Sequence, residues 1–439
     1  MDNLELRELG QDEGSTVFRA TSSSNGHEGQ QEFSLPPVDG GKDAWMFLAA
    51  AFVVETLVWG FPFAFGVFQE YYSTHPPFEG SRNIAVIGTC AMGIMYVSAP
   101  LVFAGLQRFP KTQRPAIGFG LVTMCLALGL SALSTTTMHL IITQGIFYAI
   151  GGSLVYSPTI LFMNEWFVNR KGLAFGVMWA GTGLGGVTIP LLLQYLLAKY
   201  GHKTTLIVWA VVLFVATVPL SYSLRPRLPV SQSSRLRPAS FSFLLTRNFL
   251  FLQTGNILQG LGYFIPSIYL PTHASMLGAS HSVSALTIVM FNLAMVFRCL
   301  AMGAWIDRYH VTTCVLISTI GSTIAVFVLW GLSSSLPVLF VFAVFYGFFA
   351  SSFSSTYPGV MRAVNSETQR DPNFIIAFLS AGRGIGNIAC GPVSEALVRS
   401  QAWTGEAGGA YGSGYGSLIV FTGVTAALGG VGVIGRLIK

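Results

Sequence analysis

Three charged residues lie within long apolar segments of this sequence: Glu55, Arg298 and Arg383. A charged side chain at the centre of a bilayer costs about 3 kcal/mol if it faces lipid, so each is expected to face an interior and to have a partner there. A guanidinium group can hold a carboxylate through two hydrogen bonds, which makes both arginines candidates for anion recognition. Glu55 is the candidate proton carrier, because burial of a carboxyl group favours its protonated form. The alternative is an ion pair, for example between Glu55 and Arg383, that only fastens the helices together.

Polar residues recur at helical spacing in four of the apolar segments. The clearest series has intervals of three and four residues and consists of Gln253, Asn256, Gly260, Tyr263 and Ser267. Shorter series are Gln144, Tyr148, Gly152 and Tyr156; Glu55, Trp59, Pro62 and Gly66; and Tyr346 and Tyr357 with a serine cluster. Such faces line a wet cavity or, alternatively, form hydrogen bonds between helices of a static bundle. The candidate substrate-binding residues are Trp59, Tyr148, Tyr156, Asn256, Tyr263, Arg298 and Arg383.

An acid and a base stand side by side where one apolar segment ends, in Gly303-Ala-Trp-Ile-Asp307-Arg308. A reduced copy, Phe103-Ala-Gly-Leu-Gln107-Arg108, lies 200 residues earlier. Charged groups at a helix end can bind a neighbouring helix in one state and release it in another. We therefore expect a gate formed by Asp307, Arg308, Arg108 and Arg170. The alternative is a basic residue that reaches the membrane surface beside an acidic partner.

Twelve apolar segments position these residues, six on each side of a loop that has five arginines and no acid. Each is close to the roughly 20 residues that a helix needs to cross about 30 Å of hydrocarbon. The segments are 44–68, 84–106, 115–133, 140–163, 172–197, 205–220, 249–271, 283–306, 311–332, 335–357, 374–397 and 416–436. The sequence thus predicts an all-α membrane protein with twelve transmembrane helices in two six-helix halves. The first half spans residues 44–223, the second spans 248–439, and residues 224–247 form a basic linker.

Composition and charge agree with a membrane protein. The 439 residues are 52% apolar and only 10% charged, too few charges to cover a soluble fold of this size. The formal charge of +6 is not a nucleic-acid footprint, because residues 1–43 hold nine acidic residues against three basic ones and the excess of bases lies in short loops. Residues 1–43 are expected to form a disordered tail. The loops on one side of the membrane hold 13 Lys or Arg and those on the other hold four, so both termini are expected in the cytoplasm, with the plasma membrane as the default location.

Several chemistries are not indicated. The five cysteines lie in or near apolar segments without metal-ligand spacing, and are expected to be small core residues. No nucleophile, base and orienting group occur together, and GxxxxGK[ST] is absent, so neither an enzyme nor an ATP-driven pump is expected, and no cofactor or metal. Gly181, Gly183 and Gly186 spell GxGxxG, but no strand precedes them. Close helix packing is the expected use of these glycines.

A family resemblance rests on several motifs. Residues 164–176 read Asn-Glu-Trp-Phe-Val-Asn-Arg-Lys-Gly-Leu-Ala-Phe-Gly, residues 39–45 read Asp-Gly-Gly-Lys-Asp-Ala-Trp, and residues 383–387 read Arg-Gly-Ile-Gly-Asn. Residues 65–69, Tyr71, Tyr72, Gly391 and Pro392 add to these motifs. With them, the chain resembles the fungal branch of the monocarboxylate transporter family, within the major facilitator superfamily. The resemblance covers residues 39–436. It implies the major facilitator fold, with the first helix of each three-helix repeat lining a central cavity.

The chain departs from the proton-coupled members of that family in two places. They have a lysine just after a Phe-Pro pair, whereas Phe63 follows Phe61-Pro62 here. They have an Asp four residues before an arginine, whereas Ala294 stands four before Arg298. The resemblance with these departures implies a carrier that moves a larger, less polar cargo than lactate by alternating access. The expected cargo is an organic acid or an amphiphilic metabolite, and the expected direction is export. The alternatives are proton-coupled uptake of a monocarboxylate or nutrient, and a transporter-like sensor without net flux.

Overall fold

The computed structural model describes residues 35–437, except residues 82, 229–240, 369–371 and 402. Most of the predicted acidic tail and half of the predicted linker lie outside these residues. Every regular element within the described part of the chain is a helix, as predicted. The first half contains α1 (Lys42–Phe63), α2 (Phe65–Thr74), α3 (Ile84–Val97), α4 (Ala99–Arg108), η1 (Pro110–Thr112), α5 (Gln113–Ala132), α6 (Thr137–Leu140), η2 (Ile141–Phe147), α7 (Tyr148–Trp166) and α8 (Lys171–Ser221).

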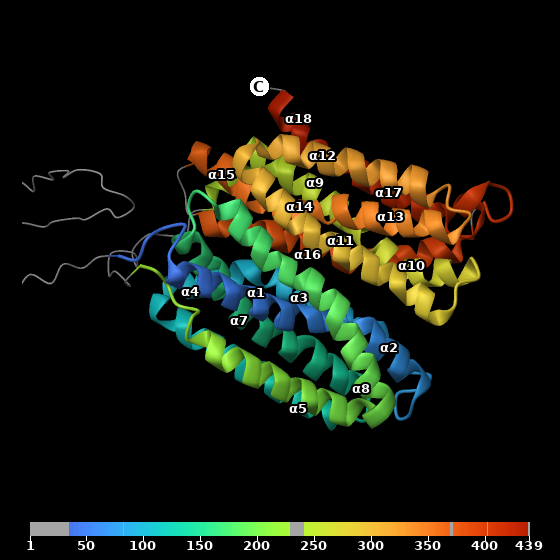
Figure 1. The fold of residues 1–439 in the computed structure, drawn as a ribbon, viewed down its shortest axis with the longest axis horizontal. Coiled ribbons are helices and arrows are strands. Elements are labelled where there is room, and N and C mark those ends of the chain that lie inside the picture. Colours follow the sequence, from blue (N-terminus) through green and yellow to red (C-terminus); the bar gives the residue numbers. More distant parts are fainter. Residues whose placement is uncertain (1–34, 82, 229–240, 369–371, 402, 438–439) are drawn as a thin grey trace, which may run out of the picture.

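The second half repeats this pattern of long helices joined by short connections. It contains η4 (Ser242–Leu245), α9 (Arg247–Tyr263), α10 (Ile265–Met276), α11 (His281–Arg308), α12 (Val311–Ile324), η5 (Ala325–Trp330), α13 (Leu336–Phe349), α14 (Ser352–Ser355), α15 (Tyr357–Thr368), α16 (Pro372–Arg399), η6 (Gly409–Gly412), α17 (Gly416–Leu428) and α18 (Val431–Leu437). In Figure 1 the first half, blue to green, lies beneath the second, yellow to red, with the long helices of both running lengthwise.

The helices in the described part of the chain cover all twelve predicted segments. Among the described residues nine helices are long and apolar enough to cross a membrane, and α3 with α4, bent by 43°, makes a tenth. α8 holds two of the predicted segments, because Gly201 breaks it with φ 74°, a conformation that favours glycine. α9 and α10 meet at Phe264 and provide the remaining segment.

The two halves approach most closely along α8 and α11. A Cβ atom on Gly176 would lie 2.3 Å from the carbonyl oxygen of Cys299, and one on Gly303 would lie 2.6 Å from that of Gly172. Farther along α8, Asn292 donates to the carbonyl oxygen of Gly186 at 3.1 Å. The glycines of α8 thus permit the close helix packing that the sequence predicts.

Apolar packing differs between the two ends of the molecule. The Asp307 end is where α8 begins and α11 ends; the Gly201 end lies opposite. At the Asp307 end, buried residues of α11, α12, α15 and α16 join the core of the first half in one continuous cluster, which includes Ile306 and Met361. A separate cluster around Trp330 and Phe342 fills the second half toward its other end. The halves therefore share a core at the Asp307 end.

Candidate functional site

Glu55 lies on the inner face of α1 and is only 3% exposed. One of its carboxylate oxygens accepts a hydrogen bond of 2.7 Å from the hydroxyl of Thr182 in α8. The other oxygen has no hydrogen-bond partner among the described residues. One turn farther along α1, the ring of Trp59 lies 4.5 Å from that of Tyr96 and 5.4 Å from that of Tyr156, while its indole N–H also has no partner in the described part of the chain. The first half thus presents an unpaired acceptor and an unpaired donor beside aromatic rings.

Arg383 provides the opposite charge from the second half. Its guanidinium group donates to the amide oxygen of Gln259 at 2.8 Å and lies 4.3 Å above the ring centre of Tyr263, a cation–π geometry. The hydroxyl of Tyr263 donates to Ser351 at 3.0 Å. Arg383 is therefore held by α9 while remaining at the interface between the halves.

Arg298 is fully buried in α11. It donates to the hydroxyl of Ser355 at 2.7 Å and to the sulfur of Cys299 at 3.0 Å, and its Nε has no partner among the described residues. Neutral groups hold this cation in place of a carboxylate. No contact among the described residues therefore neutralises the charge of Arg298.

The three intramembrane charges share one neighbourhood. Tyr96 of α3 lies within electrostatic range of both Glu55 and Arg383, and Arg298 lies within range of Arg383. No ion pair joins any of these three groups in the described ranges, where the ion pairs are Asp43 with Arg225, Asp307 with Arg362, and Glu395 with Arg399. The site therefore has two guanidinium groups near one carboxyl group and no direct neutralisation, a charge pattern suited to an anionic guest.

Aromatic rings connect the two halves around these charges. The indole N–H of Trp179 donates to the hydroxyl of Tyr156 at 3.0 Å, and its ring makes an edge contact with Tyr357 of the second half at 6.0 Å. Nearer the Gly201 end, Phe63 lies 5.6 Å from Phe264. Such faces offer flat apolar contacts for a partly apolar molecule.

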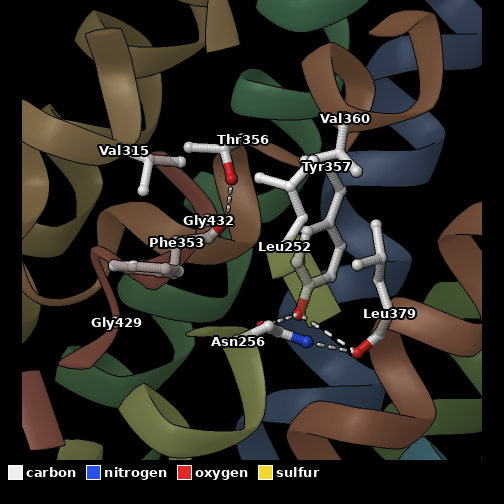
Figure 2. A pocket seen from close by; sticks show the side chains of 10 residues that line it. All are labelled: Leu252, Asn256, Val315, Phe353, Thr356, Tyr357, Val360, Leu379, Gly429 and Gly432. Atoms are coloured by element: carbon white, nitrogen blue, oxygen red, sulfur yellow. Dashed lines mark hydrogen bonds between the residues drawn. The ribbon is translucent and has the colours of Figure 1, made fainter. Parts of the chain in front are cut away.

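Two predicted binding residues, Tyr148 and Asn256, form hydrogen bonds with neighbouring helices, and none with the three charged groups among the described residues. Tyr148 donates to the carbonyl oxygen of Val58 at 3.0 Å and packs on Phe61, so its hydroxyl joins α7 to α1. The Asn256 amide donates to the carbonyl oxygen of Leu379 at 2.7 Å and accepts from the hydroxyl of Tyr357 at 3.0 Å. Figure 2 shows the bonds of Asn256 beside a cavity of about 10 Å³, which has room for about one water molecule. Both side chains bond to neighbouring helices.

Asp307, one of the predicted gating residues, joins the two halves through hydrogen bonds. Its two carboxylate oxygens accept the backbone N–H groups of Gly172 and Leu173 at 2.8 and 2.9 Å, and one of them lies 3.6 Å from the guanidinium group of Arg362. These N–H groups belong to the first turn of α8, where no side chain of the preceding residue caps the helix. Asp307 therefore caps a helix of the other half and faces the positive end of its dipole.

The other predicted gating residues are arranged differently. Arg308 is exposed, and so is Arg108, which lies over the ring of Phe109. The side chain of Arg170 is exposed, but its backbone N–H donates at 3.0 Å to Asp39. Asp39 also accepts the N–H groups of Val168 and Asn169, both at 2.9 Å. The segment before α1 is thus tied to the loop that precedes α8.

Sequence reasoning missed several residues at the site. Thr182, Trp179, Tyr96 and Gln259 contact the intramembrane charges or their aromatic neighbours. The sequence alone does not distinguish these four residues from residues that only pack between helices. The one signal in the sequence was Glu55 itself, because a carboxyl group within an apolar segment requires a polar partner.

The sequence model of the Major Facilitator Superfamily matches residues 47–310 and 254–438. "MFS transporter asaE" of Aspergillus flavus is 26% identical over 91% of this chain and 87% of its own length. The "Fujikurins efflux protein" of Gibberella fujikuroi is 25% identical over 91% and 83%, and the "Aspyridones efflux protein apdF" of Emericella nidulans is 26% identical over 83% and 74%.

A solved structure has the same fold. A double tryptophan mutant of XylE superposes with a TM-score of 0.67, covering 90% of this chain and 95% of its own, at 14% sequence identity. At that identity the likeness concerns the arrangement of helices alone. It agrees with the helices that cover the twelve predicted segments.

Proposed function

The chain belongs to the Major Facilitator Superfamily and is a multi-pass membrane transporter, and we propose that it exports an organic acid or an amphiphilic metabolite by alternating access. The observation that carries this proposal is the group of buried charges between the halves. Two guanidinium groups, Arg298 and Arg383, lie near a single carboxyl group, Glu55, without an ion pair among the described residues. A guest carboxylate would supply the missing negative charge.

The aromatic surroundings favour a cargo larger than lactate. Trp59, Tyr96, Tyr156 and Tyr263 border the charges, and the lysine of the proton-coupled monocarboxylate carriers is replaced by Phe63. The efflux proteins among the relatives are named for fujikurins and aspyridones. Membership of the monocarboxylate-type fungal branch, export of a secondary metabolite, cytoplasmic termini and a plasma-membrane location are all part of this proposal.

Alternating access requires contacts that form at one end and release in the other state. The cap from Asp307 onto α8 is such a contact, because it joins residues of different halves through hydrogen bonds that water can replace. Glu55 is proposed as the proton carrier, since one oxygen of its buried carboxyl group has no hydrogen-bond partner among the described residues. A proton moving inward on Glu55 would drive the cargo outward.

The proposal is tested by untargeted metabolite profiling of cells and medium, with the protein present, deleted or replaced by Arg383→Gln. Arg399→Gln is the matched control, because Arg399 is an exposed residue of the same helix that forms an ion pair with Glu395. An organic acid retained inside the deletion strain and the Arg383→Gln strain, but not in the control, supports export. External nutrients depleted only when the protein is present would instead establish uptake, and unchanged pools in every strain would favour a sensor.

A further inference from the structure

A cavity of about 450 Å³ lies at the Asp307 end of the first half, away from the buried charges. Four segments line it: the residues before α1, the beginning of the helix that starts at Pro110, the end of α7, and the residues that follow α8. Its volume falls within the range of about 300–1,000 Å³ of small-molecule sites. The transport proposal uses none of its lining residues.

The walls of this cavity are basic. Lys111, Arg114, Arg225 and Arg227 line it. Arg225 pairs with Asp43 at 3.2 Å, where both side chains are more than 40% exposed. The carboxylate of Glu165 accepts the backbone N–H groups of Arg227 and Leu228 at 2.9 and 3.1 Å. The described lining therefore holds four bases and no acid, and the two acids Asp43 and Glu165 contact it from outside, so positive charge is in excess.

Lys111 and Arg114 carry that excess. Both side chains are exposed, and neither has an ion pair or a side-chain hydrogen bond within the described residues. They stand in the first turns of the helix that runs from Pro110 to Ala132, which has no acid there. Positive charges at the positive end of a helix dipole are unfavourable, and an anion bound between them would offset this repulsion.

The cavity borders an exposed apolar face. α5 exposes a stripe of large apolar residues, Phe119, Val122, Leu126 and Leu130, which are 68%, 48%, 61% and 50% exposed. Lys111 lies in η1, the short turn that leads into α5, eight residues before Phe119. The ring of Phe109 is 61% exposed next to the lining residue Pro110. Exposed aromatic rings are typical of headgroup depth, so the mouth of the cavity meets the headgroup layer.

We infer that this cavity binds the phosphate-bearing headgroup of an anionic lipid, with Lys111 and Arg114 as its main ligands. The fork of an arginine matches a phosphate, and a lysine adds a point charge. The orientation predicted from loop charges places this end in the cytoplasmic leaflet, where anionic lipids are concentrated. A headgroup held here would join the segment before α1 to the residues after α8, since both line the cavity.

The test uses the full chain purified in a neutral detergent. Native mass spectrometry would measure the half-saturating concentration of a phosphatidylinositol phosphate, with phosphatidylcholine as the neutral comparison. The pair Lys111→Ala and Arg114→Ala should weaken phosphoinositide binding about thirtyfold, as expected for two basic residues near an anionic headgroup. The control pair Lys199→Ala and Lys203→Ala, near Gly201, should change it less than about threefold.

A charge-conserving pair, Lys111→Arg with Arg114→Lys, keeps the assay informative if the alanine pair folds poorly, and it should bind like the unmodified chain. Equal binding of phosphatidylcholine and the phosphoinositide would overturn the inference, as would unchanged affinity in the alanine pair. Inorganic phosphate is the second probe. If inorganic phosphate binds, its binding is lost in the alanine pair and the lipid does not bind at all, the cavity is a site for soluble phosphate and the lipid proposal is rejected.

Discussion

Replacing Asp307 with asparagine should loosen the contact between the halves at the Asp307 end. The carboxylate accepts two backbone N–H groups at 2.8 and 2.9 Å, and hydrogen bonds to a charged group contribute about 1.5–3 kcal/mol each. The amide of asparagine keeps one carbonyl oxygen, so one bond survives as a neutral bond. The ion pair with Arg362, whose side chain is 41% exposed, adds at most about 1 kcal/mol.

The lost bond, the weakened bond and the ion pair together remove at least about 2.5 kcal/mol from the closed arrangement of this end, which corresponds to at least about 70-fold in the ratio of closed to open molecules. Cys299 offers a readout, because it is fully buried in α11 against Gly176 of α8. In a chain in which the other four cysteines are replaced, a maleimide should label Cys299 only in the open form. The labelling rate should therefore rise by the same factor in Asp307→Asn.

The control is Glu395→Gln, which breaks an exposed ion pair within one helix and leaves the interface between the halves intact. Its labelling rate should equal that of the parent chain. A rate for Asp307→Asn within about threefold of the parent, in a protein that remains folded, would refute the reasoning, because the expected change is at least tenfold larger.

Three further changes test the same structure. Glu55→Gln keeps an acceptor for Thr182 but cannot carry a proton. The free energy of unfolding should therefore change little, while flux in proteoliposomes should become insensitive to an imposed pH gradient. Flux that still follows the gradient would remove Glu55 from the coupling. Gly176→Leu would force a side chain against the carbonyl of Cys299, so the closed arrangement should be lost and maleimide labelling should rise at least tenfold relative to Gly66→Leu, at a glycine with open space around it. Asp39→Ala should lower the free energy of unfolding by about 1–2 kcal/mol, because three backbone N–H groups lose their acceptor, and an unchanged thermal midpoint would contradict this role.

The fold could be predicted because membrane spans are set by length and apolarity along the chain, which are local properties. The break inside α8 was predicted between residues 197 and 205, and the structure places it at Gly201. The helical conformation on both sides of that glycine could not be read, because Lys199, His202 and Lys203 are polar residues that resemble a loop between two spans. The close approach at Gly176 and Gly303 could be predicted, because glycine has no side chain to keep two helices apart.

The site was harder to predict because its partners are distant in the sequence. The helical series on α9 was predicted from spacing, yet Gln253 and Asn256 bond to carbonyl groups of α16 more than 120 residues away. Spacing identifies a polar face and says nothing of what that face meets. Asp307 was predicted to bind charges, whereas its shortest contacts are backbone N–H groups, which every residue except proline carries and no motif records.

The shared apolar core at the Asp307 end carries a thermal consequence. Opening that end must hydrate side chains such as Ile306 and Met361, which now lie in one cluster with the first half. Hydrating apolar surface raises the heat capacity, and the cost of doing so falls on cooling. The balance between the two arrangements should thus be a curved function of temperature, with the open arrangement gaining population in the cold even though no polar contact has changed.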